Sequence, residues 1–165
     1  MELARFWRHV AMSPLKARRC FTPATLDRLQ ARIAEAEKRH RGEIRFVVEA
    51  ELTTEQLWRG ITSRERSREV FASQGVWNTA ENNGVLIYLL LADRRVEIVA
   101  DRGIDARVDP SEWQAICRMM EAHFREGGFE EGALAGVDAV SELLARHFPG
   151  GGERPNELED RPTVM

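Results

Sequence analysis

The feature that most constrains this fold is a continuous apolar run at residues 85–92. Gly84 precedes the run and Asp93 follows it. At eight residues it has less than half the length of a membrane-spanning helix, which needs about 20 residues. An uninterrupted apolar segment of this length is typical of a β-strand that is covered on both faces. The chain is therefore expected to fold around a sheet with helices on either side.

Helical and strand patterns alternate through the rest of residues 22–149. Ile44, Phe46 and Val48 alternate with charged neighbours, which predicts a strand at 43–50. Together these patterns predict an α/β fold: a three-layer-like sandwich with a small mixed sheet, a central hairpin and about four to five flanking helices. The expected elements are, in order, a helix begun by Thr22-Pro23, the strand at 43–50, a helix capped by Thr53, a hairpin ending at residue 100, a helix begun by Asp109 and a last helix ending before Pro149.

Both ends of the chain differ from this central domain. Residues 1–20 hold five basic side chains against Glu2, a net charge of +4, and their apolar residues recur at helical spacing. They predict a basic amphipathic helix, which either packs on the domain or docks on a protein partner or an anionic membrane surface. Residues 150–165 begin with three glycines, are polar, and are expected to be disordered.

Composition narrows the class of protein. The net charge of −3 and the pI of about 5.9 argue against nucleic acid as a partner. No pattern of a secretory signal or a transmembrane helix is visible, so the expected location is cytoplasmic, or peripheral to the membrane through residues 1–20. Cys20 and Cys117 are too few for a disulfide framework and are expected to be reduced. Nothing in the composition indicates an oligomeric state.

Two polar loops carry the candidate chemistry, since no nucleophile elbow, phosphate loop or dinucleotide fingerprint occurs in the chain. One loop enters the apolar strand and the other leaves its antiparallel partner, so both must lie at the same edge of the sheet. Carboxylate and amide oxygens suit hard divalent cations. The predicted ligands of Mg²⁺ or Ca²⁺ are Glu81, Asn82, Asn83, Asp101 and Asp105.

Arginines near these loops extend the prediction to phosphate. Arg102, together with Arg64 or Arg68 from the preceding helix, is expected to bind phosphate oxygens, because guanidinium groups bind them in bidentate fashion. A cation and an arginine beside one anion are the basic equipment of phosphomonoester hydrolysis, for which Arg102 and Asp105 are the predicted catalytic residues. The same residues also suit two plain turns, with Asp101 as a strand-end cap.

Residues 82–86 and 92–104, which read Asn-Asn-Gly-Val-Leu and Ala-Asp-Arg-Arg-Val-Glu-Ile-Val-Ala-Asp-Arg-Gly-Ile, resemble the TPM-type phosphatase domain. This family includes the thylakoid-lumen acid phosphatase, the photosystem II repair proteins and the levamisole-receptor modulator. The resemblance covers about residues 22–149. The matching residues are Asn82, Asn83, Gly84, Arg95, Gly103 and Asp105, with supporting spacing at Phe124, Gly128, Phe129 and Gly132 and at Val70, Phe71 and Trp77. Asp101 departs from the pattern, so its role as a ligand depends on local chemistry alone.

The resemblance implies a compact α/β fold, divalent-metal binding at the strand-end loops and phosphatase activity in some members. Two hypotheses of function follow. The first is a divalent-metal-binding domain that acts as a phosphomonoester phosphatase. The second is a non-catalytic binding or adaptor module that acts in membrane-complex assembly or the envelope stress response.

Overall fold

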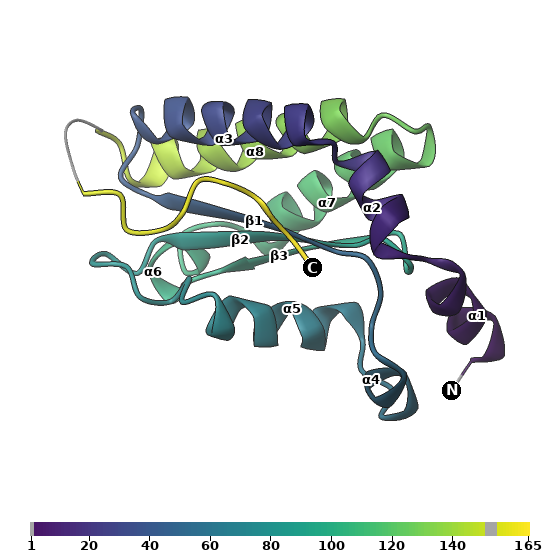
Figure 1. Ribbon diagram of the computed structural model, residues 1–165. Coiled ribbons are helices and arrows are strands. Elements are labelled where there is room, and N and C mark those ends of the chain that lie inside the picture. Colours follow the sequence, from purple (N-terminus) through teal and green to yellow (C-terminus); the bar gives the residue numbers. More distant parts are fainter. Residues whose placement is uncertain (1, 151–154) are drawn as a thin grey trace.

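The computed structural model describes residues 2–150 and 155–165 as a sheet between two helical layers (Figure 1). Helices α3, α7 and α8 cover one face of the sheet and α5 covers the other (Figure 1). The sandwich predicted from the sequence is confirmed, with eight helices in the described residues rather than four or five. The elements are α1 (Leu3–Ala11), α2 (Pro14–Cys20), α3 (Pro23–Glu37), β1 (Glu43–Glu49), α4 (Thr54–Trp58), α5 (Ser63–Ser73), β2 (Gly84–Leu90), β3 (Arg95–Ala100), α6 (Arg102–Asp105), α7 (Pro110–Arg125), α8 (Phe129–His147) and β4 (Thr163–Val164).

The apolar run forms β2, an inner strand of the sheet. The strand order is β3-β2-β1-β4, with β1 parallel to β2 and β2 antiparallel to β3. Every residue of β2 is buried. Ile87 and Leu89 belong to the core beneath α3, α7 and α8, whereas Leu86 and Tyr88 belong to the core beneath α5. The lack of hydrophobic alternation in the run therefore follows from two separate cores, one on each face.

The chain after residue 154 differs from the disordered tail expected for residues 150–165. Thr163 and Val164 pair with β1 as a short parallel strand, and the Met165 N–H donates to the Val48 carbonyl at 2.8 Å. The buried guanidinium of Arg45 donates to the backbone carbonyls of Glu159 and Arg161 at 2.7 and 2.8 Å. One buried cation thus holds a polar segment whose composition alone suggests disorder. Residues 151–154 of the expected tail lie outside the described residues.

Two predicted helices are each divided in two. The helix expected within residues 1–20 is interrupted before Pro14, where the Ser13 side chain accepts the Lys16 N–H and begins α2. The helix expected from Thr53 ends at Trp58, and Thr62 starts α5 with a capping box. Gly60, with a φ of +70°, lies between them. Both breaks follow from caps that stop one helix and start another.

None of the helices within the described residues is long and apolar enough to span a bilayer.

Candidate functional site

The two polar loops meet at one end of the β2–β3 hairpin. The Asp101 N–H donates to the Gly84 carbonyl at 2.8 Å, which extends the antiparallel register by one pair beyond Val85 and Ala100. The Gly103 N–H donates to the Asn82 carbonyl at 2.8 Å. The expectation that the loops share one edge of the sheet is thus confirmed. We call residues 81–84 and 101–103 the loop junction.

Gly103 allows this close approach. A Cβ atom at residue 103 would lie 2.4 Å from the Asn82 carbonyl oxygen and 2.7 Å from that of Glu81. Both distances are shorter than van der Waals contact, and both atoms belong to backbone, which cannot rotate away. Asn82 itself has a φ of +52°, a conformation that Asn tolerates better than most residues. The junction is therefore set by two local backbone requirements.

Two buried oxygens at the junction have no hydrogen-bond partner among the described residues. They are Oδ1 of Asn83, which is 1% exposed, and Oδ2 of Asp101, which is 9% exposed. The other polar atoms of these side chains are used: Nδ2 of Asn83 donates to the Arg41 carbonyl, and Oδ1 of Asp101 accepts the Arg102 N–H, both at 2.8 Å. These bonds fix the side chains while one oxygen of each stays unsatisfied, at a cost of about 1–3 kcal/mol per group. Oxygens of this kind suit a hard cation.

The side chains of the remaining expected ligands have other neighbours or are exposed. Glu81 forms an ion pair with Arg41 at 3.4 Å, and Asp105 is exposed on α6. Oδ1 of Asn82 lies 3.4 Å from Nε of Arg102. Within residues 2–150 and 155–165, no three His, Cys, Asp or Glu side chains lie close enough to hold a metal together. Of the expected ligands, Asn83 and Asp101 therefore carry the buried oxygens without a partner, whereas Glu81 pairs with Arg41 and Asp105 lies on α6.

The three predicted phosphate-binding arginines also separate. Arg102 is exposed beside Asn82 at the junction. Arg64 instead donates to the Ile98 carbonyl at 2.6 Å, on the outer side of β3. Arg68 is exposed on α5, and no contact within the described residues joins it to either loop. Of these three arginines, Arg102 is therefore the one that contacts a residue of the junction within the described residues.

Asp105 and Arg64 share a groove of about 610 Å³ along the open edge of β3, between α5 and α7. Side chains satisfy the outward backbone groups of the strand there. Glu121 accepts the Val96 N–H at 3.0 Å, and Arg64 donates to the Ile98 carbonyl. Such capping protects an edge strand from pairing with another chain. Cys117 also lines the groove, and burial raises the pKa of its thiol to about 12, which disfavours the reactive thiolate.

An acidic pair beside the junction was not singled out from the sequence. Glu43 pairs with Gly84 across the sheet, and burial raises the pKa of its carboxyl to about 7 despite hydrogen bonds from the tail backbone. Burial and the nearby charge of Glu43 raise the pKa of Glu37 to about 9. Both side chains accept backbone N–H groups, from Ile44 at 2.8 Å and Leu158 at 3.2 Å. The one feature of the sequence that could have indicated this pair is Glu43, an acidic residue at the first position of a buried strand.

Comparison with known proteins adds a family and two solved folds. The TPM domain family matches residues 16–143. The BA42 protein of the psychrophilic bacterium Bizionia argentinensis is 28% identical, with a TM-score of 0.76 over 87% of this chain and 94% of that one. The N-terminal domain of a protein from P. gingivalis is 24% identical, with a TM-score of 0.60 over 81% of this chain and 82% of that one, and shows the fold alone. Among curated proteins none matches.

Proposed function

The chain belongs to the TPM domain family, and we propose that its loop junction binds a divalent cation, Mg²⁺ or Ca²⁺. The observation that carries the proposal is the pair of buried, unpartnered oxygens on Asn83 and Asp101. An oxygen that no protein group satisfies either carries a desolvation cost or has a partner from solution. The proposal assigns a cation as the partner of these oxygens.

The donor set favours a hard cation over a transition metal. One carboxylate and one amide oxygen are the protein ligands offered by Asp101 and Asn83, with water completing the shell. Mg²⁺ commonly keeps several waters beside one or two carboxylates, and Ca²⁺ accepts amide and carbonyl oxygens. Softer metals prefer thiolate or imidazole, and neither side chain lies among these residues.

Calorimetric titration of Mg²⁺ and Ca²⁺ tests the site. Asp101→Asn keeps the size of the side chain and an oxygen for the Arg102 N–H but removes the charge, so the cation should bind at least about tenfold more weakly. Asp105→Asn should bind like the wild type, because that carboxylate is exposed in the groove along β3. Equal losses in both variants would instead support the larger acidic ligand set, and wild-type protein without binding would refute the site.

We extend the proposal to phosphomonoester hydrolysis, with Arg102 holding the phosphate. Arg102 and Asp105 lie three residues apart on the exposed surface of α6, next to the junction. A bound divalent cation would polarise a phosphoryl oxygen. The Arg102 guanidinium would orient the anion by paired hydrogen bonds, and Asp105 would accept a proton from the attacking water. As the new P–O bond forms, the P–O ester bond breaks, and the leaving alcohol takes up a proton from solvent.

Release of phosphate from p-nitrophenyl phosphate separates the two hypotheses of function. Turnover that requires added cation and disappears in Arg102→Ala and Asp105→Asn supports a phosphatase. Arg68→Ala is the matched control, since Arg68 is exposed on α5 and forms no hydrogen bond or ion pair with the junction within the described residues. Cation binding without any turnover above that of Arg102→Ala would leave the domain as a non-catalytic binding module.

A further inference from the structure

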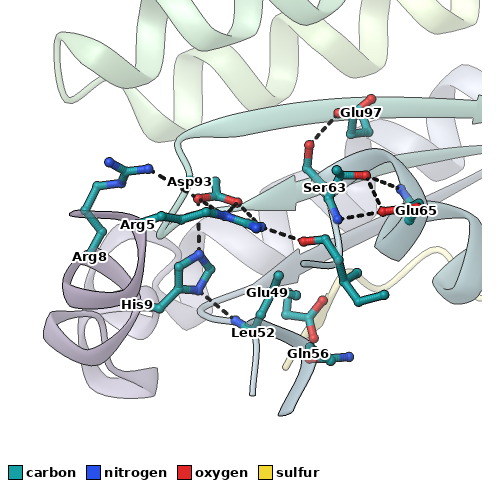
Figure 2. Close-up of polar contacts among 12 residues, drawn as sticks. Arg5, Arg8, His9, Glu49, Leu52, Gln56, Ser63, Glu65, Asp93 and Glu97 are labelled. Carbon is teal, nitrogen blue, oxygen red and sulfur yellow. Dashed lines mark hydrogen bonds and ion pairs between the residues drawn. The ribbon is translucent and has the colours of Figure 1, made fainter. Parts of the chain in front are cut away.

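Helix α1 packs on the domain through polar side chains. His9 is only 2% exposed. The Leu52 N–H donates to its Nδ1 at 2.9 Å, so Nδ1 carries no proton, and Nε2–H donates to Asp93 Oδ1 at 3.1 Å (Figure 2). Arg5 binds the same carboxylate at 2.7 Å (Figure 2). It also donates to the Ile61 carbonyl at 2.8 Å. The helix is thus held by hydrogen bonds and charge.

The apolar stripe of the same helix faces outward. Leu3, Trp7 and Val10, spaced by four and three residues, are 67%, 59% and 56% exposed. Phe6 is the apolar residue of α1 that packs on a core. A surface helix of a folded domain normally buries its apolar stripe and exposes its polar face. Helix α1 has the reverse arrangement, and a preformed apolar stripe of this kind marks an interaction surface.

Helix α2 continues this surface with an apolar residue and cations. Leu15 is 68% exposed, and Lys16, Arg18 and Arg19 are exposed beside it. No ion pair involving these three cations occurs among the described residues. Residues 1–20 carry +4, whereas the remaining chain carries −7. The exposed apolar stripe thus adjoins the most basic segment of the sequence.

We propose that α1 and α2 form a docking surface for an anionic lipid bilayer. Large apolar side chains, tryptophan above all, enter the interface between headgroups and acyl chains, while flanking Lys and Arg meet the anionic headgroups. Each cation near such a surface strengthens binding by about fivefold. A second copy of this chain is a poorer occupant, because Lys16, Arg18 and Arg19 of the two copies would repel each other.

The contacts of Asp93 give this surface its rigidity. The carboxylate lies in the turn between β2 and β3 and meets Arg5 and His9 at once, with Arg8 at 3.7 Å (Figure 2). The helix is therefore ordered before it meets a membrane. Preordering lowers the entropic cost of binding. In Figure 1, α1 and α6 lie at opposite ends of the sheet, so docking leaves the loop junction open to solution.

Co-sedimentation with vesicles tests the proposal. Wild-type protein should sediment with vesicles of mixed phosphatidylcholine and phosphatidylglycerol and stay in solution with phosphatidylcholine alone. The triple variant Leu3→Ser, Trp7→Ser, Val10→Ser should bind at least about tenfold more weakly, because its interfacial apolar side chains are lost. Trp77→Ser is the matched control: Trp77 is 55% exposed, lies outside α1 and α2, and should not affect binding.

A charge variant provides an independent test in case the triple variant does not fold. Arg18→Glu with Arg19→Glu alters only exposed side chains and should abolish sedimentation with the mixed vesicles while the circular dichroism stays unchanged. Wild-type protein that ignores the mixed vesicles would overturn the proposal. Equal binding to these vesicles by the wild type and both variants would also overturn it.

Discussion

The backbone N–H of Gly103 donates a 2.8 Å hydrogen bond to the carbonyl oxygen of Asn82, and the two residues lie too close for any side chain to stand between them. This contact joins the loop that enters β2 to the loop that leaves β3. It thereby places Asn83 and Asp101 at one junction. The geometry of the candidate site thus depends on a residue that supplies no ligand.

Gly103→Ala should destabilise the protein by about 2 kcal/mol, because the new Cβ meets two backbone carbonyl oxygens. The same change should weaken cation binding, since the loops must move apart. Urea denaturation and a calcium titration measure the two effects. Gly128→Ala is the control: its Cβ would come no closer than 3.4 Å to any neighbour, so the loss should stay below about 1 kcal/mol. Equal losses at both glycines would contradict this account.

Arg66→Ala should cost about 3 kcal/mol, because it leaves the buried carboxylate of Glu49 without its cation. Arg66 binds both oxygens of Glu49, at 2.8 and 2.9 Å, and the Tyr88 hydroxyl donates to the same carboxylate at 2.5 Å. Arg68→Ala on the same helix removes an exposed side chain and should change the free energy of unfolding by less than about 0.5 kcal/mol. Denaturant unfolding of both variants checks the difference, and equal small effects would show that the Glu49 pair is dispensable.

Glu37→Gln should flatten the dependence of stability on pH. Burial and the Glu43 charge raise the pKa of Glu37 from 4.5 to about 9 in the folded protein. The folded state therefore binds the proton more tightly, so this stabilisation is complete below pH 4.5 and is lost as pH rises toward 9. The amide keeps an oxygen for the Ile44 N–H and carries no charge.

Denaturant unfolding at about pH 5 and about pH 9 tests this change, with the variant losing less stability than the wild type on going to high pH. Glu35→Gln is the control, because Glu35 is an exposed acid on the same helix whose pKa is lowered by its hydrogen bond to Lys38. Parallel pH profiles for wild type and Glu37→Gln would show that Glu37 is ionised at neutral pH.

Asp93→Ala should loosen α1 while the sheet stays folded. Burial alone would raise the pKa of Asp93, but hydrogen bonds from His9 and Arg5 outweigh it and hold the pKa well below its usual range. Its contribution is therefore complete above about pH 3.8 and decreases as pH falls further. Hydrogen exchange at neutral pH should become faster in residues 3–11 and stay unchanged in β1 and β2. Glu112→Ala, which breaks the exposed pair with Arg146, should leave exchange in α1 unchanged.

The sheet could be predicted because its signals are local. The apolar run at 85–92 implied cover on both faces, and Asn82, Asn83 and Asp101 could be placed together from the antiparallel order alone. The Ser13-Pro14 and Thr62–Glu65 caps are equally local. They mark the points at which the two expected long helices are divided. These parts needed no knowledge of distant contacts.

The remainder depended on contacts between distant residues. The tail pairs with β1 because Arg45, more than a hundred residues earlier, binds its carbonyls. Glu81, an expected metal ligand, pairs with Arg41, and Arg64, an expected phosphate-binding residue, donates to the Ile98 carbonyl. The outward apolar face of α1 results from the position of Asp93. Hydrophobic periodicity identifies the apolar and polar faces of a helix, but it does not say which of the two packs against the domain.

The most direct test of the central claim is a titration of Mg²⁺ and Ca²⁺ into isotopically labelled protein, followed by backbone amide shifts. A cation held by Asn83 and Asp101 should shift the amides of residues 81–84 and 101–103 in a saturable way, and Asp101→Asn should abolish those shifts. Shifts spread over exposed acids without saturation, or no shifts at millimolar cation, would contradict a metal site at the loop junction.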